Sequence, residues 1–391
     1  MLRRLSTIAM TAVLALSTLT HAATAQGAES VAVDKPRALA YGALGANFNE
    51  NLDSLDYPEL REARARWIRG FFPMPQTQQG DPAKHEAIST ITKAAGKGYD
   101  TILSLKFPYD RASFPAPGSA GMAAELARLD RVLPAVLNKV KIIAIGNEPF
   151  IESLPAERDA RLNTFYETVA RHVIDYRRAH CGANCRTVLY MGALNRLDLP
   201  DRRTPAAERW MTFVRETPEI EGVDIHPHIP SPQAAQPFLD FILPRMRPDQ
   251  TFLVTEFSLV WYWKEHLQDP VPATFAQKYG FPSGTLVWQV IKAAIDAPFS
   301  ERKWDDFLKS SPWFTGQAGF LRDQMKLYRG TGRLAVATYG FKQEDAMVAN
   351  FGPDKTPWLL NSVYAAKTVR PRADLSGRGY WLEDFRALQQ P

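Results

Sequence analysis

Short apolar segments alternate with longer amphipathic segments along most of the chain, as expected for parallel strands joined by crossover helices. Several apolar segments, such as residues 140–145, are nearly continuous, so we expect them to be buried on both faces. The expected strands are residues 41–48, 66–72, 100–107, 140–146, 187–193, 222–226, 251–255 and 334–339. Eight such segments predict an α/β fold of the (β/α)8 TIM-barrel type.

An open doubly wound sheet would bury its strands in the same way. No glycine-rich phosphate loop follows the first expected strand, so the dinucleotide-binding form of that sheet is not favoured. Helices are expected over residues 120–137 and 156–179, and the longest interruption of the pattern runs over residues 258–333. We interpret this interruption, which includes a helical stretch at 284–297, as an elaborated loop between strands 7 and 8 over the active-site face.

The first residues have the pattern of an export signal. Arg3 and Arg4 precede an apolar run over residues 5–19 that is short for a membrane span, and small residues follow it. We expect cleavage after Ala25, which leaves residues 26–391 as a single barrel domain in the periplasm or outside the cell. An uncleaved anchor is the alternative, but the sequence has no second long apolar run, so we expect no membrane span after cleavage.

The charge balance argues against a nucleic-acid partner. The 391 residues include 47 lysines and arginines and 42 acidic residues, which gives a formal charge of +5. Loss of the leader removes two arginines and no acidic residue, so the charge falls to +3. Over this length so small an excess does not predict nucleic-acid binding and only weakly indicates an acidic partner.

The two cysteines, Cys181 and Cys185, lie close together in the sequence. In an exported chain such a pair predicts a local disulfide. The alternative is a metal site formed by both thiols and His180, for which no fourth ligand is evident nearby.

Two glutamates stand at the ends of expected strands. Glu148 follows the fourth strand in the run Gly146-Asn147-Glu148-Pro149, and Glu256 follows the seventh. An acid directly after a buried strand is costly unless its side chain faces the polar mouth of the barrel. Because strands 4 and 7 lie on opposite sides of a barrel, we expect the two carboxylates to face each other. Such a pair is what hydrolysis of a glycosidic bond requires.

The Asn-Glu-Pro tripeptide after the fourth strand and the acid after the seventh resemble clan A glycoside hydrolases, including families 5 and 39. The resemblance extends from residue 41 to about residue 366. It implies a retaining mechanism with Glu148 as acid/base, Glu256 as nucleophile and Asn147 as the amide that binds the sugar 2-hydroxyl. The implied substrate is a poly- or oligosaccharide with β-glycosidic bonds, and no cofactor is expected.

The sixth expected strand ends in a His-x-His motif formed by His226 and His228. The resemblance implies that a residue here contacts the nucleophile or the sugar, although His228 stands where family 5 often has tyrosine. A hydrogen bond from His228 would help to keep Glu256 ionised. Arg69 is a charged residue in the apolar second strand, and the resemblance suggests that it contacts Glu256; an arginine that bridges barrel layers is the alternative. Such an arginine would lower the pKa of Glu256, while burial would raise that of Glu148.

Aromatic residues follow the third and seventh expected strands, among them Tyr109, Trp261 and Trp263. Flat rings pack against the C–H faces of sugars, so these three residues are candidate substrate platforms. We expect at least one of the two tryptophans to contact substrate. The alternative is that the rings pack the long loop.

Three other functions remain open at this point. An inactive glycan-binding barrel would keep the cleft without needing both acids. A metal-dependent hydrolase would use His226 and His228, because alternate residues of a strand point the same way and can share an ion. Histidines are scarce in the chain, so we expect no metal. A transglycosylase would share the covalent intermediate and differ in its acceptor.

Overall fold

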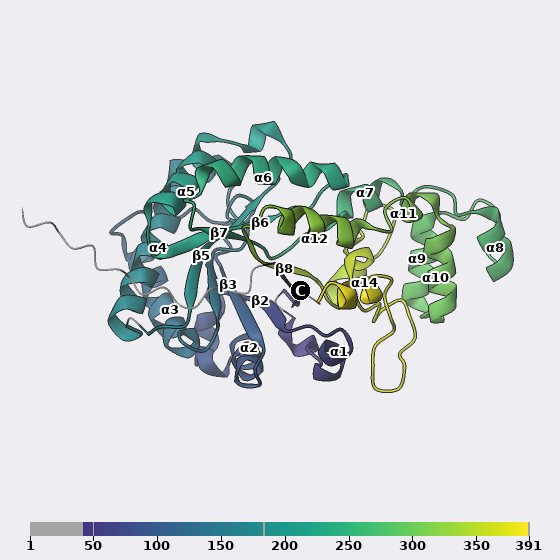
Figure 1. The fold of residues 1–391 in the computed structure, drawn as a ribbon, viewed down its shortest axis with the longest axis horizontal. Helices are drawn as coiled ribbons and strands as arrows, with labels where there is room; N and C mark the ends of the chain where they lie inside the picture. The colour runs from purple at the N-terminus through teal and green to yellow at the C-terminus, as the bar shows by residue number, and fades with distance from the viewer. Residues whose placement is uncertain (1–41, 50, 183, 390–391) are drawn as a thin grey trace, which may run out of the picture. The chain divides into compact units, whose positions relative to one another are not determined.

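The computed structural model describes residues 42–49, 51–182 and 184–389 (Figure 1). Eight parallel strands pair in sequence order and close into a barrel between β8 and β1. The strands are β1 (Ala43–Asn47), β2 (Trp67–Pro73), β3 (Asp100–Lys106), β4 (Ile142–Ile145), β5 (Val188–Asn195), β6 (Ile220–His226), β7 (Thr251–Val254) and β8 (Leu334–Gly340). The (β/α)8 barrel and all eight expected strands are therefore confirmed, whereas the expected export signal lies outside the described residues.

Helices join successive strands on the outside of the barrel. Two of them, α3 (Ala120–Val136) and α4 (Ala160–His180), occupy nearly the expected ranges. Helix α4 begins later than expected because Asp159 caps its first turn, with its side chain accepting from the backbone N–H of Arg161 at 2.9 Å. The other crossover helices are α1 (Tyr57–Glu62), α2 (Glu86–Gly96), α5 (Pro205–Glu216), α6 (Gln236–Ile242) and α12 (Phe320–Gly330).

The long interruption between strands 7 and 8 is a small helical layer. Before α12 it forms α7 (Val260–Glu265), α8 (Ala273–Tyr279), α9 (Val287–Asp296), α10 (Glu301–Ser310) and α11 (Pro312–Thr315). Figure 1 shows α8, α9 and α10 grouped together, away from the barrel strands. Phe314 of α11 packs on Trp381, with ring centroids 5.7 Å apart, so the C-terminal segment that ends in α14 (Leu382–Ala387) supports the insertion.

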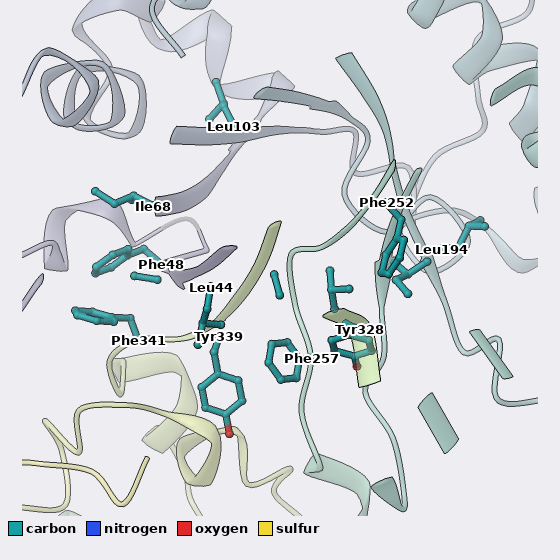
Figure 2. Close-up of a cluster of buried hydrophobic side chains, with 14 of the residues drawn as sticks. Leu44, Phe48, Ile68, Leu103, Leu194, Phe252, Phe257, Tyr328, Tyr339 and Phe341 are labelled. Atoms are coloured by element: carbon teal, nitrogen blue, oxygen red, sulfur yellow. The ribbon is translucent and has the colours of Figure 1, made fainter. Parts of the chain in front are cut away.

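The interior of the barrel explains why β2 contains an arginine. Alternate residues of a strand point to opposite faces, and Ile68 and Leu103 belong to the core between strands and helices (Figure 2). Trp67 belongs to a second buried cluster with Ile102, Ile142, Val188, Tyr190, Leu253, Ala335 and Val336. These residues come from six strands and fill the inside of the barrel. Arg69 lies two residues beyond Trp67, so it also points inward, one layer nearer the carboxyl ends of the strands.

Cys181 and Cys185 form the expected disulfide, with an S–S distance of 2.11 Å, directly after α4. The local pairing is therefore confirmed. No helix among the described residues is both long enough and apolar enough to cross a membrane.

A partly buried ion cluster joins the C-terminal segment to α1. Glu62 accepts hydrogen bonds from Nη2 of Arg372 at 2.9 Å, from Nη2 of Arg378 at 3.1 Å and from the hydroxyl of Tyr364 at 2.8 Å. Burial alone would raise the pKa of Glu62, but these hydrogen bonds lower it to about 2. The first helix and the last part of the chain are thus held together by charge.

Candidate active site

Glu148 reaches the mouth of the barrel through a turn at the end of β4. Gly146 has a φ of +103°, which residues with a side chain rarely adopt, and a Cβ there would lie 3.0 Å from the ring of Tyr166. Asn147 and Glu148 follow this turn and line a cavity of about 640 Å³. Glu256, two residues beyond β7, lines the same cavity from the opposite side of the barrel.

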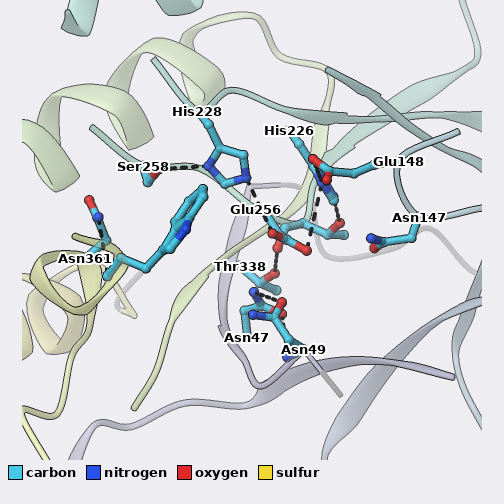
Figure 3. A network of polar contacts seen from close by, with 12 residues as sticks. Asn47, Asn49, Asn147, Glu148, His226, His228, Glu256, Ser258, Thr338 and Asn361 are labelled. Atoms are coloured by element: carbon cyan, nitrogen blue, oxygen red, sulfur yellow. Dashed lines mark hydrogen bonds and ion pairs between the residues drawn. The ribbon is translucent and has the colours of Figure 1, made fainter. Parts of the chain in front are cut away.

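His226 lies between the two acids (Figure 3). Its Nδ1 is 3.1 Å from Oε1 of Glu148 and 3.9 Å from Oε1 of Glu256. These two carboxylate oxygens are therefore separated by no more than the sum of the two distances. His226 itself is fully buried and does not line the cavity, whereas both glutamates do. The two acids that the sequence predicts as a pair thus meet at one imidazole.

A chain of hydrogen bonds fixes how His226 is protonated. The hydroxyl of Thr255 donates to Asp224, so Nε2 of His226, 2.8 Å from that hydroxyl, must be a donor. Nδ1 faces Glu148, and one proton is shared across this contact. Burial alone would lower the pKa of His226, but the surrounding carboxylates of Glu256, Asp224 and Glu148 raise it to about 10.

Two opposing effects act on the pKa of each glutamate. Burial alone would raise it, whereas neighbouring positive charges lower it. For Glu256 the positive charges of His226 and Arg69 outweigh burial and hold the pKa well below its ordinary value. Nη1 of Arg69 donates to Oε1 of Glu256 at 2.6 Å, and Nε2 of His228 lies 3.4 Å from Oε2, so both expected contacts with Glu256 are present. The pKa of Glu148 is also lowered, by the hydrogen bond and charge of His226. The expectation of a raised pKa for Glu148 is therefore wrong, because the effect of His226 outweighs that of burial.

Asn147 is held from two sides. Its Oδ1 accepts from Nη2 of Arg69, and its Nδ2 donates to Oε1 of Glu152 at 2.8 Å. One Nδ2 hydrogen remains for a ligand in the cavity. Glu152 was not predicted from the sequence; it also pairs with Nζ of Lys106 at 3.2 Å, and burial raises its pKa.

Of the three aromatic candidates, Trp261 lines the cavity. Trp263 is fully buried, and its Nε1 donates to Oδ1 of Asn361 at 2.9 Å. The hydroxyl of Tyr109 donates to Glu125 at 2.7 Å beside a separate groove. The structure therefore corrects the expectation for Trp263 and Tyr109: both rings pack the fold and do not reach the cavity.

Several cavity residues escaped sequence reasoning. Asn47 and Asn49 lie at and after the end of β1, and Asn195 and Arg196 lie at and after the end of β5. The sequence feature that could have found them is the same one that identified Glu256: each is a polar residue at or just after the end of a buried strand. Trp358 had no such signal, because it begins a short 3-10 helix (Trp358–Asn361) that lies beyond β8 and α13 (Asp345–Val348).

The site also contains a group with the composition of a metal site. Glu148, His226 and His228 have ligand atoms within 4.8 Å of one another. Both ring nitrogens of His226 are already hydrogen-bonded, and Nδ1 of His228 contacts Ser258 at 2.7 Å. Because its pKa is raised to about 10, His226 keeps both ring protons at neutral pH and offers no lone pair to a metal. This hydrogen bonding disfavours the metal-dependent alternative.

No protein-family model matches the chain, and no match was found among curated proteins. Among solved structures, a β-glucosidase from Exiguobacterium marinum matches with a TM-score of 0.51 at 7% identity, covering 89% of this chain and 97% of that one. A glucosidase from Croceicoccus marinus matches with a TM-score of 0.49 at 11% identity over 92% of this chain and 69% of that one. A GH113 β-1,4-mannanase has a TM-score of 0.44 at 8% identity over 90% and 99%. These neighbours are glycoside hydrolases, and at such identities the likeness shows the barrel fold alone.

Proposed function

We propose that the protein is an exported retaining glycoside hydrolase that cleaves β-glycosidic bonds in a poly- or oligosaccharide. Glu148 protonates the leaving oxygen while Glu256 attacks the anomeric carbon. Glu148 then takes a proton from the water that releases the glycosyl-enzyme. Glu256 suits the nucleophile because Arg69 keeps it ionised, and Glu148 suits the acid because it shares a proton with His226.

The observation that carries this proposal is the convergence of Glu148 and Glu256 on His226. The upper limit that His226 sets on their separation includes the ~5–5.5 Å of retaining enzymes and excludes most of the ~6.5–9.5 Å range of inverting ones. The β-glucosidase from Exiguobacterium marinum has the same barrel fold, which agrees with this class of reaction.

The cavity walls also suit a carbohydrate. The amides of Asn47, Asn49 and Asn195 can bond sugar hydroxyls, and Trp261 contributes an aromatic ring. Export is proposed from the leader sequence, which places the enzyme in the periplasm or outside the cell.

The roles are tested by replacing each acid with its amide. Glu148→Gln and Glu256→Gln should each lower hydrolysis by roughly a thousandfold or more, while the circular dichroism spectrum shows that the fold is retained. Glu208→Gln, at an ion pair with Arg245 on the exposed side of α5, is the matched control. Azide should restore turnover to Glu148→Ala. If Glu148→Gln or Glu256→Gln retains nearly wild-type turnover, the catalytic role proposed for that residue is wrong.

The reaction class is tested on the wild-type enzyme. A polysaccharide panel with product sizing identifies the substrate, and NMR of the fresh product should show the β-anomer first. The α-anomer first would make the enzyme inverting. Binding without hydrolysis would indicate the glycan-binding alternative, and loss of activity on chelation with recovery on metal addition would indicate the metal-dependent one.

A further inference from the structure

One wall of the cavity combines cations with aromatic rings. Arg196 follows the last residue of β5, and its guanidinium carbon lies 5.5 Å from the ring centroid of Trp261. Nζ of Lys264 lies 5.8 Å from the same centroid. Trp358 packs on Trp261 at 6.4 Å, and Lys355, from the same segment as Trp358, also lines the cavity. Of these three cations, Arg196 and Lys355 line the cavity, and Lys264 lies against the ring of Trp261 without lining it.

Arg196 is held in a fixed orientation. Its Nε and Nη2 lie 3.3 and 3.4 Å from the two carboxylate oxygens of Asp198, whose side chain is only 4% exposed. Nη1 has no hydrogen-bond partner among the residues that the structure describes, so two N–H groups remain for a ligand. The backbone of Arg196 has a φ of +53°, which is uncommon for a residue with a side chain and typical of functional sites.

The positive charge of this wall is only partly compensated. Within the described part of the chain, neither Lys264 nor Lys355 has an acidic partner, and Asp198 pairs with Arg196 alone. By contrast, Lys106 on another part of the cavity is paired with Glu152. The cavity as a whole is not cationic, because Glu148, Glu152, Glu256 and Glu344 also line it. At this wall, however, Lys355 has no acidic partner among the described residues and Arg196 keeps N–H groups for a ligand, so an anionic group is favoured there.

We propose that this wall binds an anionic substituent of the carbohydrate, the carboxylate of a uronic acid or a sulfate ester, with Arg196 as its main ligand. The inference rests on the proposed function and adds the class of substrate. A guanidinium presents several N–H groups in one plane, which matches the oxygens of a carboxylate or sulfate. The ring of Trp261 supports the guanidinium and shields the ion pair from water.

Matched pairs of polysaccharides test this site. A glucuronate-containing polysaccharide and its carboxyl-reduced form differ in the carboxylate, and a sulfated galactan and its desulfated form differ in the sulfate. Binding is measured by calorimetry in the Glu256→Gln background, so that hydrolysis does not interfere. We expect the charged form of one pair to bind about tenfold or more tightly than its neutral form. The pair that shows this preference identifies the group.

Variants of Arg196 assign the preference to this wall. Arg196→Asn removes the cation and keeps a residue type that tolerates the left-handed conformation, so the preference should fall below about threefold. Arg196→Lys should retain part of it. Arg209→Gln breaks an exposed ion pair with Glu167 and is the matched control for net charge. Equal binding of charged and neutral forms in both pairs, or a preference that survives Arg196→Asn, overturns the inference.

This test separates the inference from the proposed function. If the wild type hydrolyses a neutral polysaccharide and shows no preference in either pair, the anionic site fails and the hydrolase stands. If an Arg196-dependent preference exists but no polysaccharide is hydrolysed, the hydrolase fails and the anionic site stands.

Discussion

Replacing His226 with glutamine should make the activity of the proposed hydrolase fall at a lower pH on the alkaline side of its pH profile. In the wild type, Glu148 and His226 share one proton across 3.1 Å, and the productive state is the pair that carries this single proton. Because the pKa of His226 is raised to about 10, the pair keeps its proton up to about pH 10. The alkaline limb of kcat/KM should therefore lie near that value.

The size of the effect follows from what remains in the variant. Glutamine carries no titrating proton, so Glu148 is protonated only below its own pKa. Without the charge of His226, burial and the charge of Glu256 raise the pKa of Glu148 above its ordinary value. Above that pKa, kcat/KM of the variant should fall about tenfold for each pH unit, whereas the wild type should stay constant up to about pH 10.

The assay is kcat/KM from pH 4 to 10 on the best substrate of the panel. His172→Gln is the matched control and should keep the wild-type profile, because His172 lies on α4 and contacts only Asp130 of α3, with 2.7 Å between Nε2 and Oδ1. A His226→Gln profile that runs parallel to the wild type, lowered by one constant factor, would refute the shared proton and leave His226 a structural residue.

Three further predictions concern stability. Glu62→Gln should lower the free energy of unfolding at pH 7 by about 1–2 kcal/mol after allowance for solvent screening. Because the folded pKa of Glu62 is about 2 and the unfolded pKa is near 4.3, this contribution is complete above the unfolded value and is lost as pH falls toward 2, so urea unfolding should show the difference shrinking over that interval. Reduction of the Cys181–Cys185 disulfide opens a short loop and gives the unfolded chain more conformational freedom. It should lower the free energy of unfolding by about 2 kcal/mol, measured with and without reductant. An unchanged free energy of unfolding would show that the disulfide does not restrict the unfolded chain. Trp263→Phe should cost about 1–3 kcal/mol by thermal unfolding, because Oδ1 of Asn361 keeps only the backbone N–H of Leu259 as a donor and the smaller ring leaves space in the core. An unchanged KM would confirm that the ring of Trp263 does not contact substrate.

The barrel and its pair of facing glutamates were predictable because both depend on short-range sequence patterns. A strand buried on both faces is recognisable from its own residues, and the carboxyl end of each parallel strand meets the mouth of the barrel whatever the loops do. Glu148 and Glu256 could therefore be placed from strand order alone. The polar contact of Arg69 was also predictable, since an isolated charge in an apolar strand needs a polar partner.

The aromatic wall was harder to predict because it depends on the conformation of an insertion. Trp261 and Trp263 lie in α7, where residues two apart point to different sides, so one ring lines the cavity and the other enters the core. Tyr109 is held away from the cavity by Glu125, a partner on α3 that no local pattern connects to it. The position of Trp358 depends on the whole C-terminal segment.

The burial of Arg69 affects any attempt to use the proposed hydrolase for synthesis. Glycosynthases are made by replacing the nucleophile with a small neutral residue. At Glu256, the proposed nucleophile, this change would leave the fully buried guanidinium of Arg69, now bonded to Glu256 at 2.6 Å, without its charged partner. Asn47, Asn49 and Ser104 would still accept its hydrogen bonds, but none carries charge. A donor sugar with fluorine at the anomeric carbon would place a partial negative charge beside Arg69, and this charge would grow as the C–F bond breaks. The cation that keeps Glu256 ionised would then bind the leaving fluoride of the donor.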